Sequence, residues 1–364
     1  MDRTLTVEPF SLDLARPLST ADRTITHRDG FLVRIERDGV EGIGEATPLP
    51  GWTESIDECR TALERAVSVS EREPLARSTT DRETILAEVP ASCPAARHGL
   101  ALAFSDLRAR QARQPLYRYL GGTERVTSVP VNATIGDGSV EATVRAATRA
   151  VDRGYDCLKC KVGARPVTAD VERLRAVRDA VGPAVELRGD ANGAWSREQA
   201  DRAFEELEAV NISYVEQPLS PDNIEGHTAL RGGDVGVALD ETLAEISVNE
   251  ILSAGAADVL ILKPMVLGGL DRVRDAAIMA HEGTDSTSSE DVIPIVTTTI
   301  DGAYARSGAV HVAASISGIS ACGLATGDRL AEDLLTHRLP ATRGRIAVPQ
   351  GNGNISRRSG ITDA

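Results

Sequence analysis

The sequence is short of lysine, of aromatic residues and of long apolar runs. Only three of its 40 basic residues are lysines (Lys159, Lys161 and Lys263), so arginine supplies nearly all of the positive charge. Phe, Trp and Tyr make up 3% of the chain, so a core must be built mainly from aliphatic side chains. No run approaches the roughly 18 apolar residues of a membrane span, and the start lacks a basic and apolar signal. A cytoplasmic protein is therefore expected.

The charge balance and the cysteines exclude further classes. A net charge of −14 disfavours binding to nucleic acid or to an anionic membrane. The expected partner is a small-molecule carboxylate held by local positive charge, and a homo-oligomer is left open. The five cysteines are spread widely, and no second pair lies at zinc-binding distance from Cys157 and Cys160. We expect neither a structural zinc nor a redox role.

Residues 1–124 are predicted to form an α+β module. Residues 31–36 alternate apolar and polar side chains and precede Arg37-Asp38-Gly39, which predicts a hairpin. Residues 53–118 have apolar side chains three and four apart, the spacing of helices. Small residues between positions 95 and 103 predict a helix that packs closely against its neighbour.

Residues 125–331 alternate short apolar strands with helices rich in Arg, Glu and Ala. Eight strands separated by helices are typical of an α/β barrel of the TIM type. The expected strands are 129–134, 157–162, 185–190, 214–217, 236–240, 259–263, 293–298 and 320–325. Residues 282–291 (EGTDSTSSED) predict an acidic surface loop, and residues 332–364 are expected to return to the first module.

Charged residues end five successive predicted strands. Lys159 and Lys161 lie two apart on one strand, so their side chains share a face. The following four strands end in Asp190, Glu216, Asp240 and Lys263, at steps of 23 to 29 residues. Because the carboxyl ends of barrel strands meet at one rim and form the active site, we expect these side chains to come together there.

This set of residues suits proton transfer assisted by a metal. Three carboxylates on adjacent strands repel one another unless a cation lies among them, and oxygen ligands favour Mg²⁺, with Mn²⁺ as the alternative. The pKa of a lysine can be lowered until it loses its proton near neutral pH, whereas that of an arginine cannot. The like charges of Lys159 and Lys161 lie close together, which favours a neutral amine in one of them. The metal and the remaining ammonium groups would stabilise the dianion formed when a proton next to a carboxylate is removed.

Several short sequence motifs resemble those of a known family. They are LKCKVG, ELRGDANGAW, YVEQPL, ALDETL and LKPMVLGG, together with GIGEATPLPGW and PLYRYLGG in the first module. With them the sequence resembles the enolase superfamily, in its muconate-lactonizing subgroup. The resemblance implies an α/β fold with a modified TIM-type (β/α)7β barrel and an N-terminal α+β capping domain. Within the subgroup it is most similar to the o-succinylbenzoate synthases, through GEATPLPGW, TTTID at 297–301 and GLATG near Gly323.

The resemblance also implies a role for each residue. The metal ligands for Mg²⁺ are Asp190, Glu216 and Asp240. Lys161 takes the α-proton and returns it to the departing hydroxide, Lys263 stays protonated against the opposite face, and Lys159 tunes Lys161. The implied substrate contacts are Arg188, Asn192, Thr298, Thr299 and Gly323. The implied reaction is the syn dehydration of 2-succinyl-6-hydroxy-2,4-cyclohexadiene-1-carboxylate to 2-succinylbenzoate in menaquinone biosynthesis.

Other reactions remain open at this point. Asp301 and Ala325 depart from the synthase pattern, which has Glu and Asp there. The same metal and lysines serve N-succinylamino acid racemases, dipeptide epimerases and muconate cycloisomerases, although residues 323–326 lack the acidic pair that dipeptide epimerases usually have. A Schiff-base aldolase would not need three carboxylates. A barrel that has lost its enzymatic activity and serves only for binding or structure would lack a metal ligand or a lysine. The sequence keeps all of them.

Overall fold

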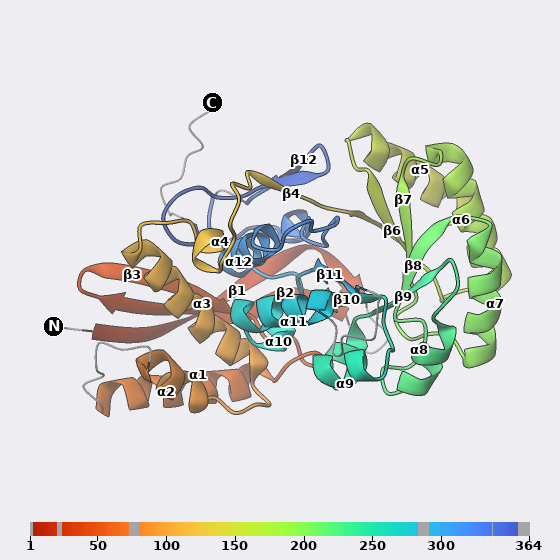
Figure 1. The fold of residues 1–364 in the computed structure, drawn as a ribbon. Helices are drawn as coiled ribbons and strands as arrows, with labels where there is room; N and C mark the ends of the chain where they lie inside the picture. The colour runs from red at the N-terminus through yellow and green to blue at the C-terminus, as the bar shows by residue number, and fades with distance from the viewer. Residues whose placement is uncertain (1–2, 20–23, 73–79, 283–290, 337, 356–364) are drawn as a thin grey trace.

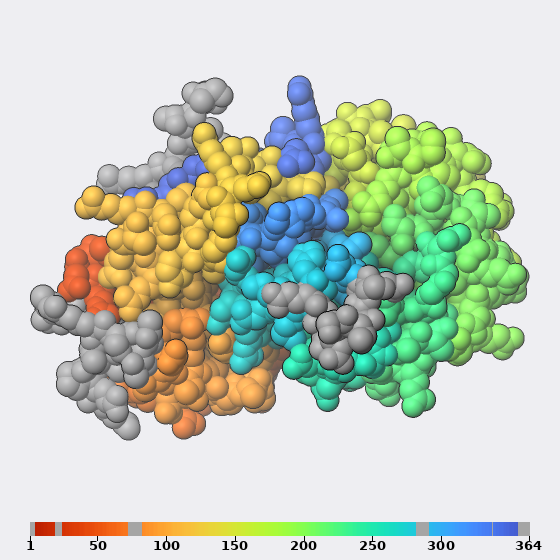
Figure 2. Space-filling view, viewed as in Figure 1, coloured from red at the N-terminus to blue at the C-terminus, as the bar shows by residue number. Residues whose placement is uncertain are grey.

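The computed structural model describes residues 3–19, 24–72, 80–282, 291–336 and 338–355 (Figure 1). An N-terminal module packs directly against an α/β barrel, as the orange-to-yellow and green-to-blue surfaces of Figure 2 show. Across the described residues, no helix combines the length and the apolarity needed to cross a bilayer. Most of the acidic stretch 282–291 lies outside the described residues.

The N-terminal module begins with a three-stranded antiparallel sheet. Its strands, in spatial order, are β1 (Arg3–Ser19), β2 (Thr24–Arg37) and β3 (Val40–Ala46). The predicted hairpin is confirmed: Asp38 and Gly39 join β2 to β3 with φ values of 53° and 75°, the left-handed conformations that a tight two-residue turn requires. The alternating residues Phe31, Val33 and Ile35 of β2 are buried against the helices.

The predicted helical stretch forms four helices, which are α1 (Ile56–Arg72), α2 (Thr80–Ala87), α3 (Pro94–Gln111) and α4 (Leu116–Tyr119). The small residues of α3 let it lie against β3 with almost no side chain between them. A Cβ atom on Gly44 would lie 1.9 Å from the carbonyl oxygen of Gly99, so neither backbone could approach this closely with a larger residue at position 44.

Seven parallel strands form the curled sheet of the barrel. In chain order they are β5 (Ala133–Ile135), β6 (Cys157–Lys161), β7 (Glu186–Asp190), β8 (Ile212–Glu216), β9 (Gly236–Leu239), β10 (Val259–Leu262) and β11 (Ile293–Val296), and neighbours in the chain are neighbours in the sheet. The helices that cover it are α5 (Val140–Asp152), α6 (Val167–Val181), α7 (Arg197–Glu208), α8 (Ile224–Leu230), α9 (Val248–Ser253), α10 (Pro264–Leu267), α11 (Leu270–Glu282) and α12 (Ala303–Ala314). Two 3₁₀ turns complete it, η1 (Glu241–Ala244) and η2 (Gly327–Arg329).

Two strand predictions need correction. Residues 320–325 form no strand, although all of them are described; isolated parallel bridges join Cys322 to Val131 and Gly323 to Thr297. This segment, the seam, therefore lies between the two edges of the sheet and makes one bridge to each. The predicted strand 129–134 is divided into β4 (Ser128–Pro130) and β5, because Pro130 has no N–H to continue a ladder and β4 pairs antiparallel with β13 instead.

The C-terminal segment touches both parts of the molecule. Its hairpin, β12 (Ala341–Thr342) and β13 (Arg345–Ala347), pairs with β4. Further on, the backbone N–H of Asn354 donates to Asp106 of α3 at 2.6 Å. His311 of α12 lies 2.6 Å from the carbonyl oxygen of Asn354 through Nε2 and accepts from the Tyr117 N–H at Nδ1. The domain boundaries near 124 and 331 stay predictions from the sequence.

His311 makes the fold sensitive to acid. Burial lowers its pKa to about 4, whereas in the unfolded chain it titrates near 6.5. Between these values the unfolded chain binds more protons, so stability is present above pH 6.5 and is lost as the pH falls towards 4. We expect this residue alone to lower the free energy of unfolding by about 2 kcal/mol between pH 7 and pH 5. Urea unfolding at both pH values measures it; His311→Gln should weaken the dependence, and an unchanged slope contradicts the assignment.

Candidate active site

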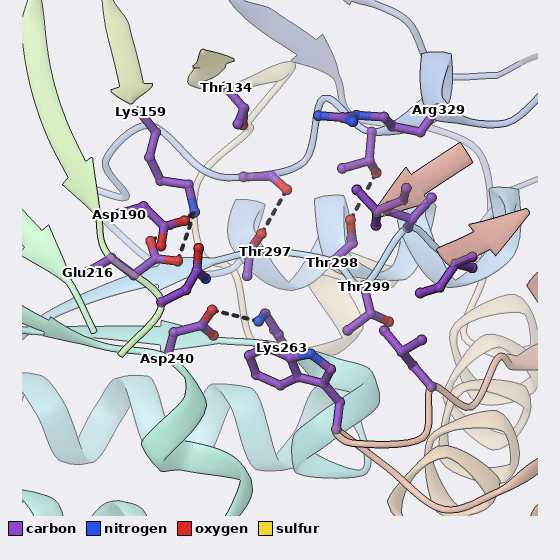
Figure 3. Close-up of a pocket in the computed structure, with 18 of the residues that line it drawn as sticks. Thr134, Lys159, Asp190, Glu216, Asp240, Lys263, Thr297, Thr298, Thr299 and Arg329 are labelled. Carbon is purple, nitrogen blue, oxygen red and sulfur yellow. Dashed lines mark hydrogen bonds and ion pairs between the residues drawn. The ribbon is translucent and has the colours of Figure 1, made fainter. Parts of the chain in front are cut away.

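A pocket of about 240 Å³ opens at the carboxyl ends of the barrel strands (Figure 3). It is lined by most of the residues singled out in the sequence, which are Lys159, Lys161, Asp190, Asn192, Glu216, Asp240, Lys263, Thr298, Thr299 and Gly323. Only Arg188 of that set does not line it. The structure thus brings together residues that are up to 164 positions apart, between Lys159 and Gly323.

Strand register explains why the charged side chains meet. Lys161 is paired with Asp190, and Asp190 with Glu216, so the three lie in one row across β6, β7 and β8. Glu216 is paired with Ala238, and Asp240, two residues beyond, points to the same face of the sheet. The parallel sheet therefore places one carboxylate on each of three adjacent strands, all facing the barrel axis.

Each carboxylate forms an ion pair with a lysine. Lys159 donates to both oxygens of Glu216, at 2.8 and 2.9 Å, and lies 3.0 Å from Asp190. Lys161 donates to Asp190 and to Asn192 Oδ1, both at 2.7 Å. Lys263 donates to Asp240 at 2.7 Å. All three lysines of the chain are thus used to balance the charge of these three carboxylates.

Burial and mutual charge shift the pKa values of these groups in different directions. Burial, followed by the charge of Asp190, raises the pKa of Glu216, and burial also raises that of Asp240. Burial opposes ionisation of Asp190, but the ammonium groups of Lys159 and Lys161 outweigh it and hold its pKa well below the usual range. Like-charge crowding was expected to favour a neutral amine in Lys159 or Lys161. At Lys159, burial is instead outweighed by Asp190, Glu216 and Asp240, which hold its pKa well above the usual value.

The carboxylate set fits a divalent cation. Oδ1 of Asp190 and Oδ1 of Asp240 are buried and accept no hydrogen bond from any described residue. Buried carboxylate oxygens without a donor are costly, and a hard cation such as Mg²⁺ is the partner that oxygen ligands on adjacent strands suit. Within the described part of the chain, no three acidic, imidazole or thiol groups already converge on one point; the Lys159 ammonium lies between Asp190 and Glu216. Residues that could hold the metal are Asp190, Glu216 and Asp240.

Lys263 contacts an aromatic residue of the N-terminal module. Its Nζ lies 3.2 Å from the centroid of the Trp52 ring, which is a cation–π contact. Trp52 follows Gly51 in the loop between β3 and α1, so this module supplies part of the pocket wall (Figure 3). In the sequence, GEATPLPGW indicates a loop over the substrate, but nothing there pairs Trp52 with Lys263.

Further lining residues were not predicted from the sequence. They are Leu14, Leu18, Ile25, Arg28, Leu49, Trp52, Thr134, Thr297, Ile300, Thr326 and Arg329. Many come from β1, β2 and the loop after β3, which reach the barrel only through tertiary packing. Those that lie in the GEATPLPGW, TTTID and GLATG strings are Leu49, Trp52, Thr297, Ile300 and Thr326.

The substrate contact expected of Arg188 is corrected by its position. It lies two residues before Asp190 on the same strand, so it points into the barrel one layer beneath the pocket. Its guanidinium donates to Glu186 at 2.7 Å and to the carbonyl oxygen of Ala321 at 2.6 Å, and it covers the Tyr214 ring. Arg188 therefore ties the seam to the barrel interior and does not reach the pocket.

Hydroxyl groups form the wall next to the seam. Thr297 donates to the carbonyl oxygen of Gly323 at 2.9 Å, and the hydroxyls of Thr298 and Thr326 are 2.9 Å apart. Thr299 donates to the buried Asp301 at 2.5 Å. Asp301, which departs from the expected Glu, does not line the pocket and instead orients Thr299.

Together these features define an α/β barrel with an N-terminal capping domain and a pocket in which three lysines and three carboxylates meet. Residues 142–354 match the family model described as enolase C-terminal domain-like, and residues 3–121 match the mandelate racemase / muconate lactonizing enzyme N-terminal domain. The chain belongs to the enolase superfamily, with the two domains of its mandelate racemase and muconate lactonizing enzyme members, which confirms the fold and family predicted from the sequence.

Individual relatives differ in their reactions. The hydrophobic dipeptide epimerase of Enterococcus faecalis is 30% identical over 72% of this chain and 75% of its own length. The o-succinylbenzoate synthase of Thermosynechococcus vestitus is 28% identical over 82% and 85%. The solved dipeptide epimerase of Enterococcus faecalis, complexed with Mg and the dipeptide L-Leu-L-Tyr, has a TM-score of 0.82 and 25% identity, covering 97% of this chain and 99% of that one.

The Lys263–Trp52 contact gives an optical test for the metal site. The chain has two tryptophans, so Trp195→Phe leaves Trp52 as the only one. A divalent cation that binds Asp240 weakens its pairing with Lys263, and this changes the environment of the ring beneath the amine. We expect Mg²⁺ to change the Trp52 fluorescence saturably, EDTA to reverse it, and Asp240→Asn to abolish it. Emission that is indifferent to saturating Mg²⁺ contradicts the assigned site.

Proposed function

We propose that this chain is a magnesium-dependent o-succinylbenzoate synthase, a hydro-lyase that aromatises 2-succinyl-6-hydroxy-2,4-cyclohexadiene-1-carboxylate. The main support is the charge distribution of the pocket. Among its described lining residues, the only acids are Asp190, Glu216 and Asp240, and the remaining wall contains threonines, aliphatic residues and two arginines. Such a wall suits a substrate whose second functional group is an anion, and it offers no carboxylate to a peptide ammonium.

The proposed metal site is formed by Asp190, Glu216 and Asp240 for Mg²⁺, with Mn²⁺ as the alternative. When bound, the cation supplies positive charge that offsets the negative charge developing on the substrate carboxylate. With their charge shared in this way, Asp190, Glu216 and Asp240 would balance the Lys159 ammonium less fully. Lys159 can then tune Lys161 through its positive charge, as proposed from the sequence.

Lys161 is the proposed base. Its side chain is 36% exposed, against 16% for Lys159 and 10% for Lys263, so it is the amine most open to a molecule in the pocket. In the proposed reaction, Lys161 Nζ takes the proton from the carbon bearing the carboxylate. The same ammonium then gives that proton to the hydroxyl leaving from the neighbouring carbon on the same face, so water departs and the ring becomes aromatic.

Lys263 is the proposed stabilising cation. It donates to Asp240 and rests on the Trp52 ring, so both contacts hold its Nζ in one place in the pocket wall. A syn dehydration needs one base and one cation, whereas racemisation needs a base on each face. The unequal surroundings of Lys161 and Lys263 therefore support the dehydration. The proposed substrate contacts are Asn192, Thr298, Thr299 and Gly323, which line the pocket, whereas Arg188 does not.

The second candidate is racemisation or epimerisation with the same residues. The 30% identity to a dipeptide epimerase favours it, and N-succinylamino acids share the succinyl group with the proposed substrate. Against dipeptides, residues 323–326 (GLAT) offer no acidic side chain. Muconate-type cycloisomerisation is a further alternative, with less support from the strings of the seventh strand and the seam. Lysine Schiff-base chemistry leaves the three carboxylates unexplained.

Turnover of the cyclohexadiene substrate tests the proposal. With Mg²⁺ we expect the appearance of the aromatic product, followed by absorbance, with loss of activity in EDTA and recovery on adding Mg²⁺ or Mn²⁺. The comparison substrates are N-succinylamino acids and dipeptides, assayed for α-proton exchange in deuterated water. Racemisation of these without any aromatisation overturns the synthase assignment and favours the second candidate.

Replacing Lys161 by arginine separates charge from basicity. Lys161→Arg keeps a cation beside Asp190 but cannot accept a proton near neutral pH. We expect turnover and α-proton exchange to fall by about 10²- to 10⁴-fold, the typical contribution of a positioned base, while the melting temperature stays close to wild type. The matched control is Arg165→Lys, at a half-buried position that pairs with Asp137 and does not line the pocket, which should leave turnover unchanged. Retained exchange in Lys161→Arg would falsify the role of base.

A further inference from the structure

Arg329 has no role in the mechanism proposed above, although it lines the pocket. It ends the 3₁₀ turn η2 that follows the seam, and its side chain is exposed. In Figure 3 the side chain extends towards Thr134 and lies apart from the three carboxylates, with Thr297 between them in this view. It therefore places a guanidinium in a part of the pocket wall away from the proposed metal ligands.

The backbone next to Arg329 is fixed by the N-terminal module. Leu330 forms an antiparallel bridge with Leu14 of β1, and the Ala331 N–H donates to the carbonyl oxygen of Asp13 at 2.8 Å. The Leu330 side chain is buried with Leu12 and Leu14. These contacts hold the end of η2 against the capping strand and so set where the guanidinium emerges.

The guanidinium of Arg329 is available to a ligand. Within the described part of the chain it has no hydrogen bond or ion pair with another residue, including its exposed neighbour Asp328. Arg28, the other arginine of the pocket, instead donates to the carbonyl oxygens of Thr47, Pro48 and Ile300. Arg28 thus joins two loops of the wall, and Arg329 presents its donors to the pocket.

A second cavity adds positive charge around Arg329. It has a volume of about 280 Å³ and shares Thr134, Thr326 and Arg329 with the active pocket. This cavity is also lined by Arg149, which lies on α5, and by Arg153, which directly follows that helix. The acidic residue in its lining is Asp328. In a chain with a net charge of −14, this is a local excess of positive charge, which attracts and orients an anion.

We propose that Arg329 is a specificity-determining residue that binds the second carboxylate of a dicarboxylate substrate, while the first lies at the metal ligands. This inference rests on the proposed function and names the group that selects the succinyl arm. A planar guanidinium can hold a carboxylate through two parallel hydrogen bonds, and such charge-assisted contacts are stronger than neutral ones. A substrate that lacks the second carboxylate leaves these donors unused.

Ligand binding tests the inference separately from turnover. The probes are 2-succinylbenzoate and its tail amide, which is neutral at the succinyl end, titrated by calorimetry with Mg²⁺ present. We expect wild type to bind the dicarboxylate about 10- to 100-fold more tightly than the amide, the range expected of hydrogen bonds to charged groups. Arg329→Met should abolish this preference with little change in amide binding, and Arg329→Lys should keep part of it.

The matched control is Arg149→Met, which removes a nearby charge outside the active pocket and should keep at least most of the preference. Melting temperatures of the variants show that each is folded. A wild type that binds both probes alike, or a preference that survives in Arg329→Met, overturns the inference. Failure of the wild type to aromatise the cyclohexadiene overturns the proposed function instead, because the binding comparison does not depend on turnover.

Discussion

The repulsion among three buried carboxylates is the constraint on which the rest of this structure depends. Asp190, Glu216 and Asp240 are each 4% exposed or less and stand on adjacent strands, where a low dielectric strengthens their mutual charge. The chain meets this constraint with its only three lysines. The amines that balance the carboxylates are therefore also the groups to which the proposed proton transfer is assigned, so a divalent cation that replaced part of this balance would affect both proposed roles together.

The pocket exists only when the two parts of the chain are joined. Glu45, at the end of β3, accepts hydrogen bonds from the N–H groups of Gly302, Tyr304 and Ala305 at the start of α12. Burial, with the nearby Asp301, raises the pKa of Glu45 to about 7. A buried carboxylate at a helix N-terminus fixes the orientation of the capping sheet on the barrel. The same contact between the two modules brings the loop containing Trp52 against Lys263.

The sequence predicted the residues of the strand ends well and the rest of the pocket poorly, for a physical reason. Strand period and the length of a βα unit place Lys161, Asp190 and Glu216 by local rules, and the described sheet follows those rules. Trp52 lies in GEATPLPGW, which indicates a loop over the substrate, but its contact with Lys263 depends on packing between distant segments. The same holds for the position of Arg329, which no local pattern encodes. Arg188 points to the inner face of the sheet, as the alternation of side chains along β7 predicts. It lies below the pocket, however, because alternation does not tell how far along the strand the pocket begins. The seam has the composition of a strand, yet it pairs through single bridges.

The seam has a consequence for how such an enzyme can change during evolution. Cys322 and Gly323 each make a single bridge, one to each edge of the sheet. Substitutions after Gly323 therefore break no extended ladder of strand pairing. The charged residues of β6 to β9 lie within or directly beside continuous pairing, where a change disturbs several strands at once. The molecule thus separates the charged residues, which stand in a continuous sheet, from a stretch of pocket wall that depends on little strand pairing. Substitutions along residues 323–329 can therefore reshape this wall while the paired lysines and carboxylates stay in place.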